Sequence, residues 1–231
     1  MSKLLRENQP GTQDNNRKGW SQRLRQDGAQ RAAWRISRKI VSPILKMDAS
    51  FLFDTSLADS VRASCLDGLE VHIYRGLESL TTVQAYIASM GVKCSAEERL
   101  GRGEAAVIVS RETQGLGFTW VAFADVFVPE FEMIILVPPL CIYHYDSFVL
   151  AQWRGRGIHA AMIKAAKQFA FDQGCKRAVS LIDVLNVSSL RLVERWDRRH
   201  DMIIVYLRMR GFKRALRMAL GQPLRSRFRK V

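Results

Sequence analysis

Short runs of β-branched and aromatic residues, separated by polar and glycine-containing segments, dominate the apolar pattern of the first two thirds of the chain. Such runs are typical of strands, because these side chains pack well on a pleated surface. Apolar residues at helical spacing predict two helices among them, at 79–90 and 95–100. The predicted strands cover residues 49–57, 70–75, 105–110, 117–128, 132–137 and 140–150.

The pattern changes to a helical period after Gly157. Strands are predicted at 178–184 and 202–207, with a helix at 188–199 between them. The series of strands followed by this linked strand–helix–strand–helix–strand unit predicts an α/β or α+β fold with a mixed sheet. The first helix of the unit is expected to end near Gly174, and its apolar residues recur at i, i+3, i+4, i+7, i+8 and i+11 on one stripe: Ile158, Ala161, Met162, Ala165, Ala166 and Phe169.

Charge is distributed unevenly along the chain. The formal net charge is +14, yet residues 40–207 carry 17 basic and 19 acidic side chains, so the excess lies at the two ends. We therefore expect a basic N-terminal extension at 1–45, disordered or helical, one domain at 46–212, and a basic C-terminal tail at 213–231.

The C-terminal end could contact a polyanionic surface. Residues 209–220 could form a basic amphipathic helix that lies on an anionic membrane, or that packs its apolar stripe on the domain. The tails would bind any polyanion weakly, and no nucleic-acid-binding motif is present, so no specific nucleic-acid partner is expected.

The compartment follows from what the sequence lacks. No apolar run reaches the length of a membrane span, and residues 1–16 lack the apolar stretch of a secretory signal. The four cysteines are scattered, with no histidine at ligand spacing: Cys65, Cys94, Cys141 and Cys175. We therefore expect reduced thiols and no metal site. The protein is expected to be cytoplasmic, and to lie at the inner membrane surface if the tails bind lipid.

The turn Arg154-Gly155-Arg156-Gly157-Ile158 is the strongest candidate for chemistry. It lies between a predicted strand and the long helix. The first turn of a helix has backbone N–H groups without intrahelical partners, and the helix dipole is positive there. Glycines let a ligand approach the backbone closely, and the arginines add positive charge. The turn could bind a pyrophosphate; spacing alone fits an ordinary strand–helix turn with surface arginines equally well.

Residues 148–192 resemble the acyl-CoA signature of the GNAT superfamily of N-acyltransferases. In that family a strand ending in Val, here Val149, precedes Arg/Gln-x-x-Gly-x-Gly/Ala at a helix start, and an Asn-containing segment follows later, here at Asn186. The resemblance implies a mixed, mostly antiparallel central sheet flanked by helices. It also implies acetyl-CoA or another acyl-CoA as co-substrate.

The resemblance assigns roles to individual positions. The backbone of Ser147, Phe148 and Val149 would hold the acyl carbonyl and the pantetheine arm. Asn186 would face the pantetheine or the thiol, although it could equally cap a helix. The pyrophosphate would be wrapped by the amides of Arg154, Gly155, Arg156, Gly157, Ile158 and His159.

Two positions depart from the family pattern. His159 stands where Gly or Ala closes the signature, and its side chain could touch the phosphates or, as we favour, point outward from the first helical turn. Val193 stands where many members have the tyrosine that protonates the leaving thiolate. The acid step would then need solvent or another residue.

Candidates for the base lie just before Val149. Alternation along a strand places His144 and Asp146 on one face, and Tyr143, Tyr145 and Ser147 on the other. His144 or Asp146 could accept the amine proton directly or through water, or could be ordinary hydrogen-bonded residues. Glu130 and Glu132 could bind a cationic amine or belong to a solvated loop.

The resemblance therefore predicts an N-acyltransferase that moves an acyl group, expected to be acetyl, from acyl-CoA to a primary amine. Attack would be direct, in a ternary complex, and the acceptor would be a small molecule or an amino sugar. Two alternatives stay open: a GNAT-like module that binds CoA without catalysis, which the missing tyrosine favours, and a basic protein of membrane surfaces or nucleic acid.

Overall fold

The computed structural model describes residues 33–34, 36–37, 39–42, 45–57, 68–195, 202–209, 215–221 and 228–230. The chain divides into two compact units. One comprises Met1–Met47 and Leu207–Ala215; the other comprises Asp48–Tyr206 and Leu216–Val231 and contains the helices α2 to α5. In the part of the chain that is described, no helix is long and apolar enough to cross a membrane.

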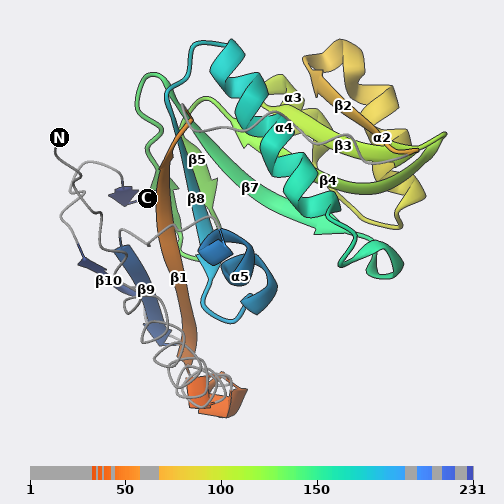
Figure 1. Ribbon diagram of the computed structural model, residues 1–231. Helices are drawn as coiled ribbons and strands as arrows, with labels where there is room; N and C mark the ends of the chain where they lie inside the picture. Colours follow the sequence, from red (N-terminus) through yellow and green to blue (C-terminus); the bar gives the residue numbers. More distant parts are fainter. Residues whose placement is uncertain are drawn as a thin grey trace, which may run out of the picture. The chain divides into compact units, whose positions relative to one another are not determined.

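The larger sheet is mixed and has eight strands among the described residues, in the order β10-β9-β1-β8-β7-β4-β3-β2 (Figure 1). Strands β7 and β8 run parallel. The pairs β1–β8, β2–β3, β3–β4 and β4–β7 are antiparallel. The predicted mixed, mostly antiparallel sheet flanked by helices is thus confirmed. The strands are β1 (Leu45–Ser56), β2 (Glu70–Arg75), β3 (Ala105–Arg111), β4 (Gln114–Ala122), β7 (Cys141–Val149), β8 (Arg177–Asp183), β9 (Met202–Met209) and β10 (Ala215–Gly221).

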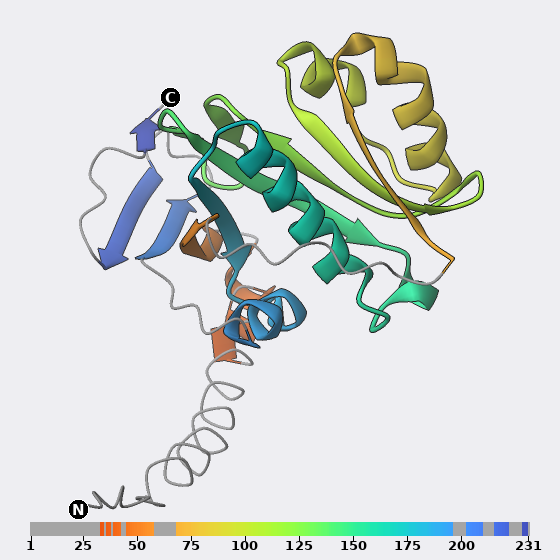
Figure 2. The ribbon, with the colours of Figure 1, turned by 45° about the horizontal axis from the view of Figure 1, so that its top comes forward.

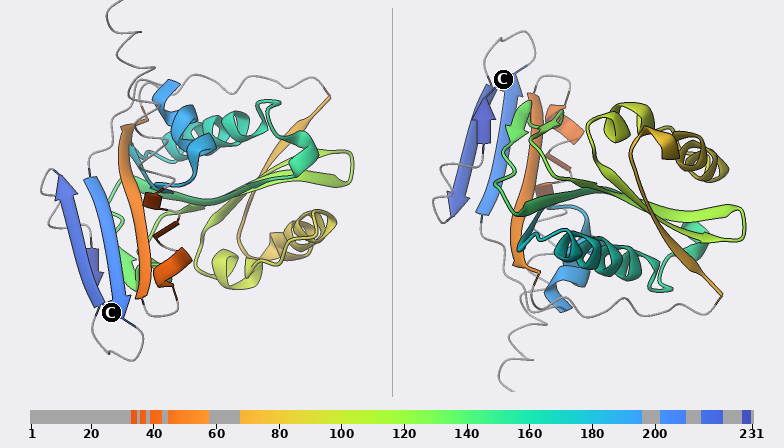
Figure 3. Two further views of the ribbon diagram at one scale, coloured as in Figure 1. Left: turned by 90° about the horizontal axis from the view of Figure 1, so that it is seen from below. Right: turned by 90° about the horizontal axis from the view of Figure 1, so that it is seen from above.

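Helices cover both faces of the sheet. Helices α2 (Leu80–Ser89) and α3 (Ala96–Gly101) lie on one face, and α4 (Ile158–Asp172) and α5 (Val187–Arg195) lie on the opposite one (Figures 2 and 3). Two single-turn 3-10 helices, η1 (Leu77–Ser79) and η2 (Ala151–Trp153), precede α2 and the turn before α4. A smaller sheet has the order β11-β6-β5, from Phe228–Lys230, Met133–Ile135 and Val126–Val128.

Strand β3 shows why its apolar run is continuous. Its residues alternate between the two hydrophobic layers: Ala106 and Ile108 pack on the side of α2 and α3, and Ala105, Val107 and Val109 pack on the side of α4. A strand that is covered on both faces has apolar residues at every position, so it reads as a run rather than as an alternation.

The long helix follows the predicted stripe. Helix α4 begins at Ile158, and five of the six stripe residues are buried; Phe169 is half-buried, with its ring edge-on to Phe123 at 6.1 Å between centroids. The chain leaves the helix through Gly174, whose φ of 82° suits a residue without a Cβ.

Two predicted elements are wrong. The strand predicted at 117–128 is two strands, because β4 ends at Ala122 and β5 begins at Val126 in the other sheet. Part of the helix predicted at 209–220 is instead strand β10, next to β9, so this segment does not support the membrane contact that such a helix was expected to make. Apolar residues four positions apart in the sequence fit one face of a strand as well as a helix stripe. Most of the basic N-terminal segment lies outside the described residues.

Candidate functional site

Strands β7 and β8 separate within the sheet. Their parallel pairing joins only Cys141–His144 with Arg177–Ser180, although β7 continues to Val149 and β8 to Asp183 (Figure 1). Near the end of β7, the Leu150 N–H donates to Leu116 O at 2.9 Å, towards β4. Because successive residues of a strand point their backbone groups to opposite edges, Val149 points its own groups away from β4. The far half of β7 therefore presents an edge to the space between the diverging strands.

A β-bulge interrupts β7 at this point. Phe118 pairs with Phe148 and Trp120 pairs with Tyr145, so Asp146 and Ser147 together oppose the single residue Thr119. Asp146 has a φ of 48°, in the left-handed region that few residues other than glycine adopt. The bulge adds one residue and so reverses the alternation of side chains beyond it.

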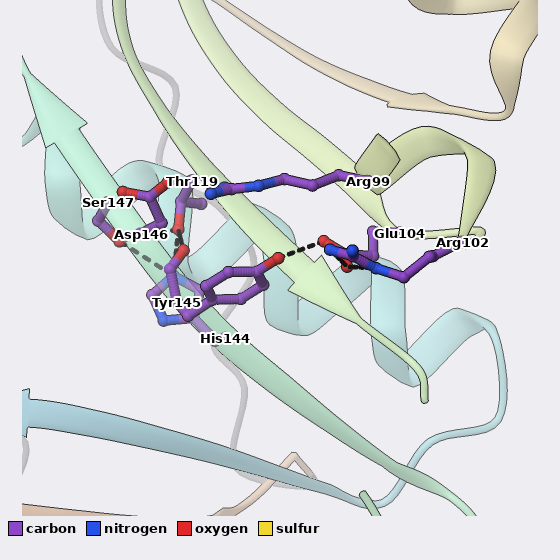
Figure 4. Close-up of polar contacts among 8 residues, drawn as sticks. All are labelled: Arg99, Arg102, Glu104, Thr119, His144, Tyr145, Asp146 and Ser147. Atoms are coloured by element: carbon purple, nitrogen blue, oxygen red, sulfur yellow. Dashed lines mark hydrogen bonds and ion pairs between the residues drawn. The ribbon is translucent and has the colours of Figure 1, made fainter. Parts of the chain in front are cut away.

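The prediction that His144 and Asp146 share a face is consequently wrong. Ser147 lies with His144, since both hydrogen-bond to the hydroxyl of Thr119, and Asp146 forms an ion pair with Arg99 of α3 (Figure 4). The predicted alternation of side chains along β7 would have been correct only if the strand had no extra residue.

A buried hydroxyl joins the polar groups on the α4 side. Thr119 Oγ1 lies 2.7 Å from His144 Nε2, 2.8 Å from Ser147 Oγ and 3.2 Å from the backbone oxygen of Tyr145. Burial, together with the nearby charges of His159 and Lys167, lowers the pKa of His144 to about 3. His144 is therefore neutral at physiological pH.

On the α3 side, Arg99 organises a second polar network. Its guanidinium lies 2.6 Å from Asp146 Oδ2 and stands over the rings of Trp120 and Tyr145, at 5.1 and 5.0 Å from their centroids. The Tyr145 hydroxyl donates to the buried carboxylate of Glu104, which Arg102 also contacts at 2.7 Å (Figure 4). Burial and this hydrogen bond raise the pKa of Tyr145. Its proton is therefore held towards Glu104.

The glycine turn has the geometry expected of a tight strand–helix connection. Gly155 and Gly157 both have positive φ, 78° and 81°, and Gly157 is the N-cap residue of α4. Arg154 donates from Nε to the Val149 backbone oxygen at 3.1 Å, and Arg156 stacks over the Trp153 ring at 4.9 Å. The arginines thus flank an exposed turn at a helix N-terminus.

The start of α4 places His159 within the helix. Gly157 is the N-cap residue, so His159 is the second residue of α4. His159 is half-buried and lines the cavity described below, and burial lowers the pKa of its ring. Our preference for an outward-pointing His159 is therefore wrong.

Asn186 caps a helix, which is one of the two alternatives that the sequence left open. Its Oδ1 accepts from the Ser189 N–H at 3.2 Å and from the Ser188 hydroxyl at 3.0 Å, which caps α5. The residue also lines the cavity. Val193, at the place of the absent tyrosine, is buried with Phe53, Ile182 and Leu190.

A cavity of about 720 Å³ extends along the separation of β7 and β8. It brings together residues of both polar networks with His159 and Asn186, whereas Phe148, Val149 and the turn from Arg154 to Ile158 are not among its lining residues. Of the two predicted glutamates, it includes Glu130 and not Glu132. Its ionisable lining residues are Asp48, Glu98, Arg99, Arg102, Glu130, Tyr143, His144, Tyr145, Asp146, His159, Lys167 and Asp183.

Sequence reasoning missed Thr119 and Arg99. Thr119 is one polar residue in the buried run of β4, and this isolation was the available signal, because a buried hydroxyl needs partners. Arg99 lies among the charges of a short helix and gave no signal. In the described ranges, no group of three or more His, Cys, Asp or Glu side chains is arranged to hold a metal ion.

Comparisons with known proteins point to one family. The model of the Acetyltransferase (GNAT) family matches residues 96–197. A GCN5-related N-acetyltransferase from Kribbella flavida is 14% identical, with a TM-score of 0.52, over 75% of this chain and 63% of that one. A Drosophila protein is 12% identical, with a TM-score of 0.51, over 77% of this chain and 57% of that one. The chain thus spans less than two thirds of the length of either, and these two likenesses show the fold alone. Among curated proteins no match was found.

Proposed function

We propose that the protein is an acyl-CoA-dependent N-acyltransferase, because residues 96–197 match the model of the GNAT acetyltransferase family, as the sequence resemblance predicted. It would move an acetyl group from acetyl-CoA to a primary amine by direct attack. The observation that carries the proposal is the separation of β7 from β8 along a cavity, close to a glycine turn at a helix N-terminus.

Each part of acetyl-CoA has a matching feature in this arrangement. Backbone N–H groups at the start of α4, with Arg154 and Arg156, suit the pyrophosphate. The unpaired edge of β7 from Ser147 to Val149 suits the amide groups of the pantetheine, which can hydrogen-bond as an added strand would. The Arg154 contact with the Val149 oxygen would then be exchanged for a contact with the ligand.

The acceptor amine is proposed to enter from the side of Glu130. This exposed carboxylate lines the cavity, and its charge contributes to raising the pKa of the buried Tyr143. A cationic amine of a small molecule or an amino sugar would be attracted to Glu130 and to other carboxylates of the cavity lining, among them Glu98 and Asp146. His144, neutral and within the cavity, is the proposed proton acceptor; Asp146 is already paired with Arg99.

Titration calorimetry and thiol release test the proposal in two steps. Acetyl-CoA should bind the protein, and the paired variant Arg154→Ala/Arg156→Ala should bind it roughly tenfold more weakly, since each exposed contact to a phosphate contributes about 1 kcal/mol or less. Arg111→Ala, a change at an exposed arginine at the end of β3, is the control. The absence of acetyl-CoA binding would refute the proposal.

Release of CoA thiol in the presence of amines, amino sugars and peptides is the second step. Amine-dependent release identifies the enzyme and its acceptor class. Tight binding of acetyl-CoA without release for any amine would instead support a CoA-binding module without catalysis, which the buried Val193 in place of an acid favours.

A further inference from the structure

We propose that His144, Thr119 and Ser147 form a proton relay that carries the proton of the attacking amine to the departing thiolate of CoA. The inference rests on the proposed acyl transfer and names the groups that would move its proton. It supplies the acid step for which the chain has Val193 in place of a tyrosine.

The three side chains are arranged as a chain with two ends at the cavity. His144 and Ser147 line the cavity, and Thr119, with no exposed surface, lies behind them. Thr119 Oγ1 is 2.7 Å from His144 Nε2 and 2.8 Å from Ser147 Oγ, whereas Ser147 Oγ and His144 Nε2 are 3.5 Å apart (Figure 4). Short hydrogen bonds thus connect the two cavity residues through Thr119 rather than directly.

The β7 bulge creates this connection. With regular alternation Ser147 would lie on the face opposite to His144; the extra residue turns its hydroxyl to the same side. The bulge also lies where β7 has separated from β8, beside the space in which the thioester would lie. The same feature therefore exposes the strand edge and aligns the relay.

The two tyrosines of the cavity lining are less suited to donate this proton. The Tyr145 hydroxyl donates to Glu104, and burial raises the pKa of Tyr143 beyond that of a free phenol. Ser147 is exposed to the cavity and can turn its hydroxyl hydrogen towards a ligand, because a hydroxyl rotates freely.

The proton balance closes over one reaction. The amine first releases its ammonium proton to solvent, and the neutral nitrogen then bonds to the thioester carbonyl carbon. The surplus proton of the attached nitrogen passes to His144 Nδ1, for which the described residues supply no hydrogen-bond partner. His144 gives its Nε2 proton to Thr119 Oγ1, Thr119 gives its hydroxyl proton to Ser147, and Ser147 gives its own to the sulfur as the C–S bond breaks. The products are the amide and CoA thiol. Thr119 and Ser147 keep their proton count, and His144 changes tautomer.

The low pKa of His144 fits a relay better than a simple base. A ring whose pKa is about 3 is a poor store for a proton at neutral pH. In the relay the ring releases one proton as it gains another, so no buried imidazolium forms beside His159 and Lys167. The surroundings that weaken a simple base do not oppose this transfer.

Matched variants at Thr119 test the relay. With acetyl-CoA and an amine from the acceptor panel, Thr119→Val should lower kcat by about 10²-fold, because general acid–base catalysis typically contributes that much or more. Thr119→Ser, which keeps the hydroxyl, should stay within about threefold of the unaltered protein. Equal losses in Thr119→Val and Thr119→Ser would overturn the relay, as would full activity in Thr119→Val.

Ser147→Ala provides a test at an exposed position where folding is not at risk. It should lose a similar factor in kcat while acetyl-CoA affinity changes by less than about twofold, and imidazole buffer should restore part of kcat in proportion to its acid form. A merely structural role would not respond to the buffer, so no response overturns the relay. Failure of the unaltered protein to transfer acetyl to any amine would refute the proposed function itself, a result distinct from normal activity in the variants.

Discussion

Asp146 shows how much of the site depends on a single residue. Its positive φ is unusual for a residue with a side chain, and aspartate is among the few that tolerate it. The ion pair with Arg99 holds the side chain away from the Thr119 network. The conformation of one residue therefore decides which polar groups meet on each side of β7.

Arg99→Ala should lower the free energy of unfolding by about 2 kcal/mol. The change removes the bond to Asp146 and the contacts of the guanidinium with Trp120 and Tyr145, and hydrogen bonds to charged groups and cation–π contacts are each worth about 0.5–3 kcal/mol. Urea denaturation measures the loss. Arg111→Ala removes the same side chain from an exposed position and should change the value by less than about 0.5 kcal/mol; equal losses would show that Arg99 has no special role.

The buried histidine predicts a dependence of stability on pH. His144 has a folded-state pKa near 3, below the 6.5 of an unfolded histidine, so between these values the unfolded chain binds more protons. Its contribution is present above pH 6.5 and is lost as the pH falls towards 3. Between pH 7 and pH 5 the loss is about 2 kcal/mol at most. His144→Gln should flatten this part of the stability profile in denaturant titrations; an unchanged slope would contradict the lowered pKa.

Among the elements, strand β4 lies unusually close to β7 and to the start of α4 at Gly117. A Cβ built on Gly117 would lie 2.7 Å from the Phe148 oxygen, 3.2 Å from Val149 Cγ2 and 3.3 Å from Ile158 Cγ2. These neighbours belong to the strand edge and to the start of α4. Only glycine permits β4 to lie this close to both.

Gly117→Ala should therefore destabilise the fold and weaken acetyl-CoA binding together. Overpacking a buried position costs about 1–3 kcal/mol, and the displaced atoms belong to the proposed binding edge. Gly101→Ala is the control, because there the added Cβ would meet only Leu77 Cδ2, at 3.9 Å, in ordinary contact at the end of a helix. Denaturation and calorimetry on both variants measure the effect. Unchanged affinity in a destabilised Gly117→Ala would separate this strand contact from the binding site.

The elements also show what the sequence could and could not predict. Strand β2 was predicted to the residue, and α4 began where its stripe began, because regular periodicity reports burial directly. The bulge at Asp146 was not predicted, because one inserted residue does not change the composition of the strand. It nevertheless moves every following side chain to the opposite face of the sheet. The residues 209–220 were misassigned because apolar positions four apart satisfy both a helix stripe and one face of a strand.

For the whole molecule, the excess of basic residues lies at the chain ends and not in the region that lines the cavity. The lining of the cavity comes from residues between Asp48 and Val193, a region whose acidic and basic residues nearly balance. An anionic co-substrate would therefore be held by local groups, the α4 N-terminus and its arginines, more than by the net charge of +14. We therefore expect acetyl-CoA to stabilise the folded protein, and other anions to stabilise it much less.

Acetyl-CoA at about 100 times its Kd should stabilise the folded protein by about 2.7 kcal/mol. For a chain of this size such a gain raises Tm by roughly 5–10 °C, and each further tenfold in ligand should add about 1.4 kcal/mol. ATP at the same concentration offers phosphates to the α4 turn but no pantetheine to the edge of β7, so its shift should be under about 2 °C. Differential scanning calorimetry over a ligand series measures both. Equal shifts for the two ligands would show that the molecule has a general anion site at the helix N-terminus and that the separated strands take no part in binding.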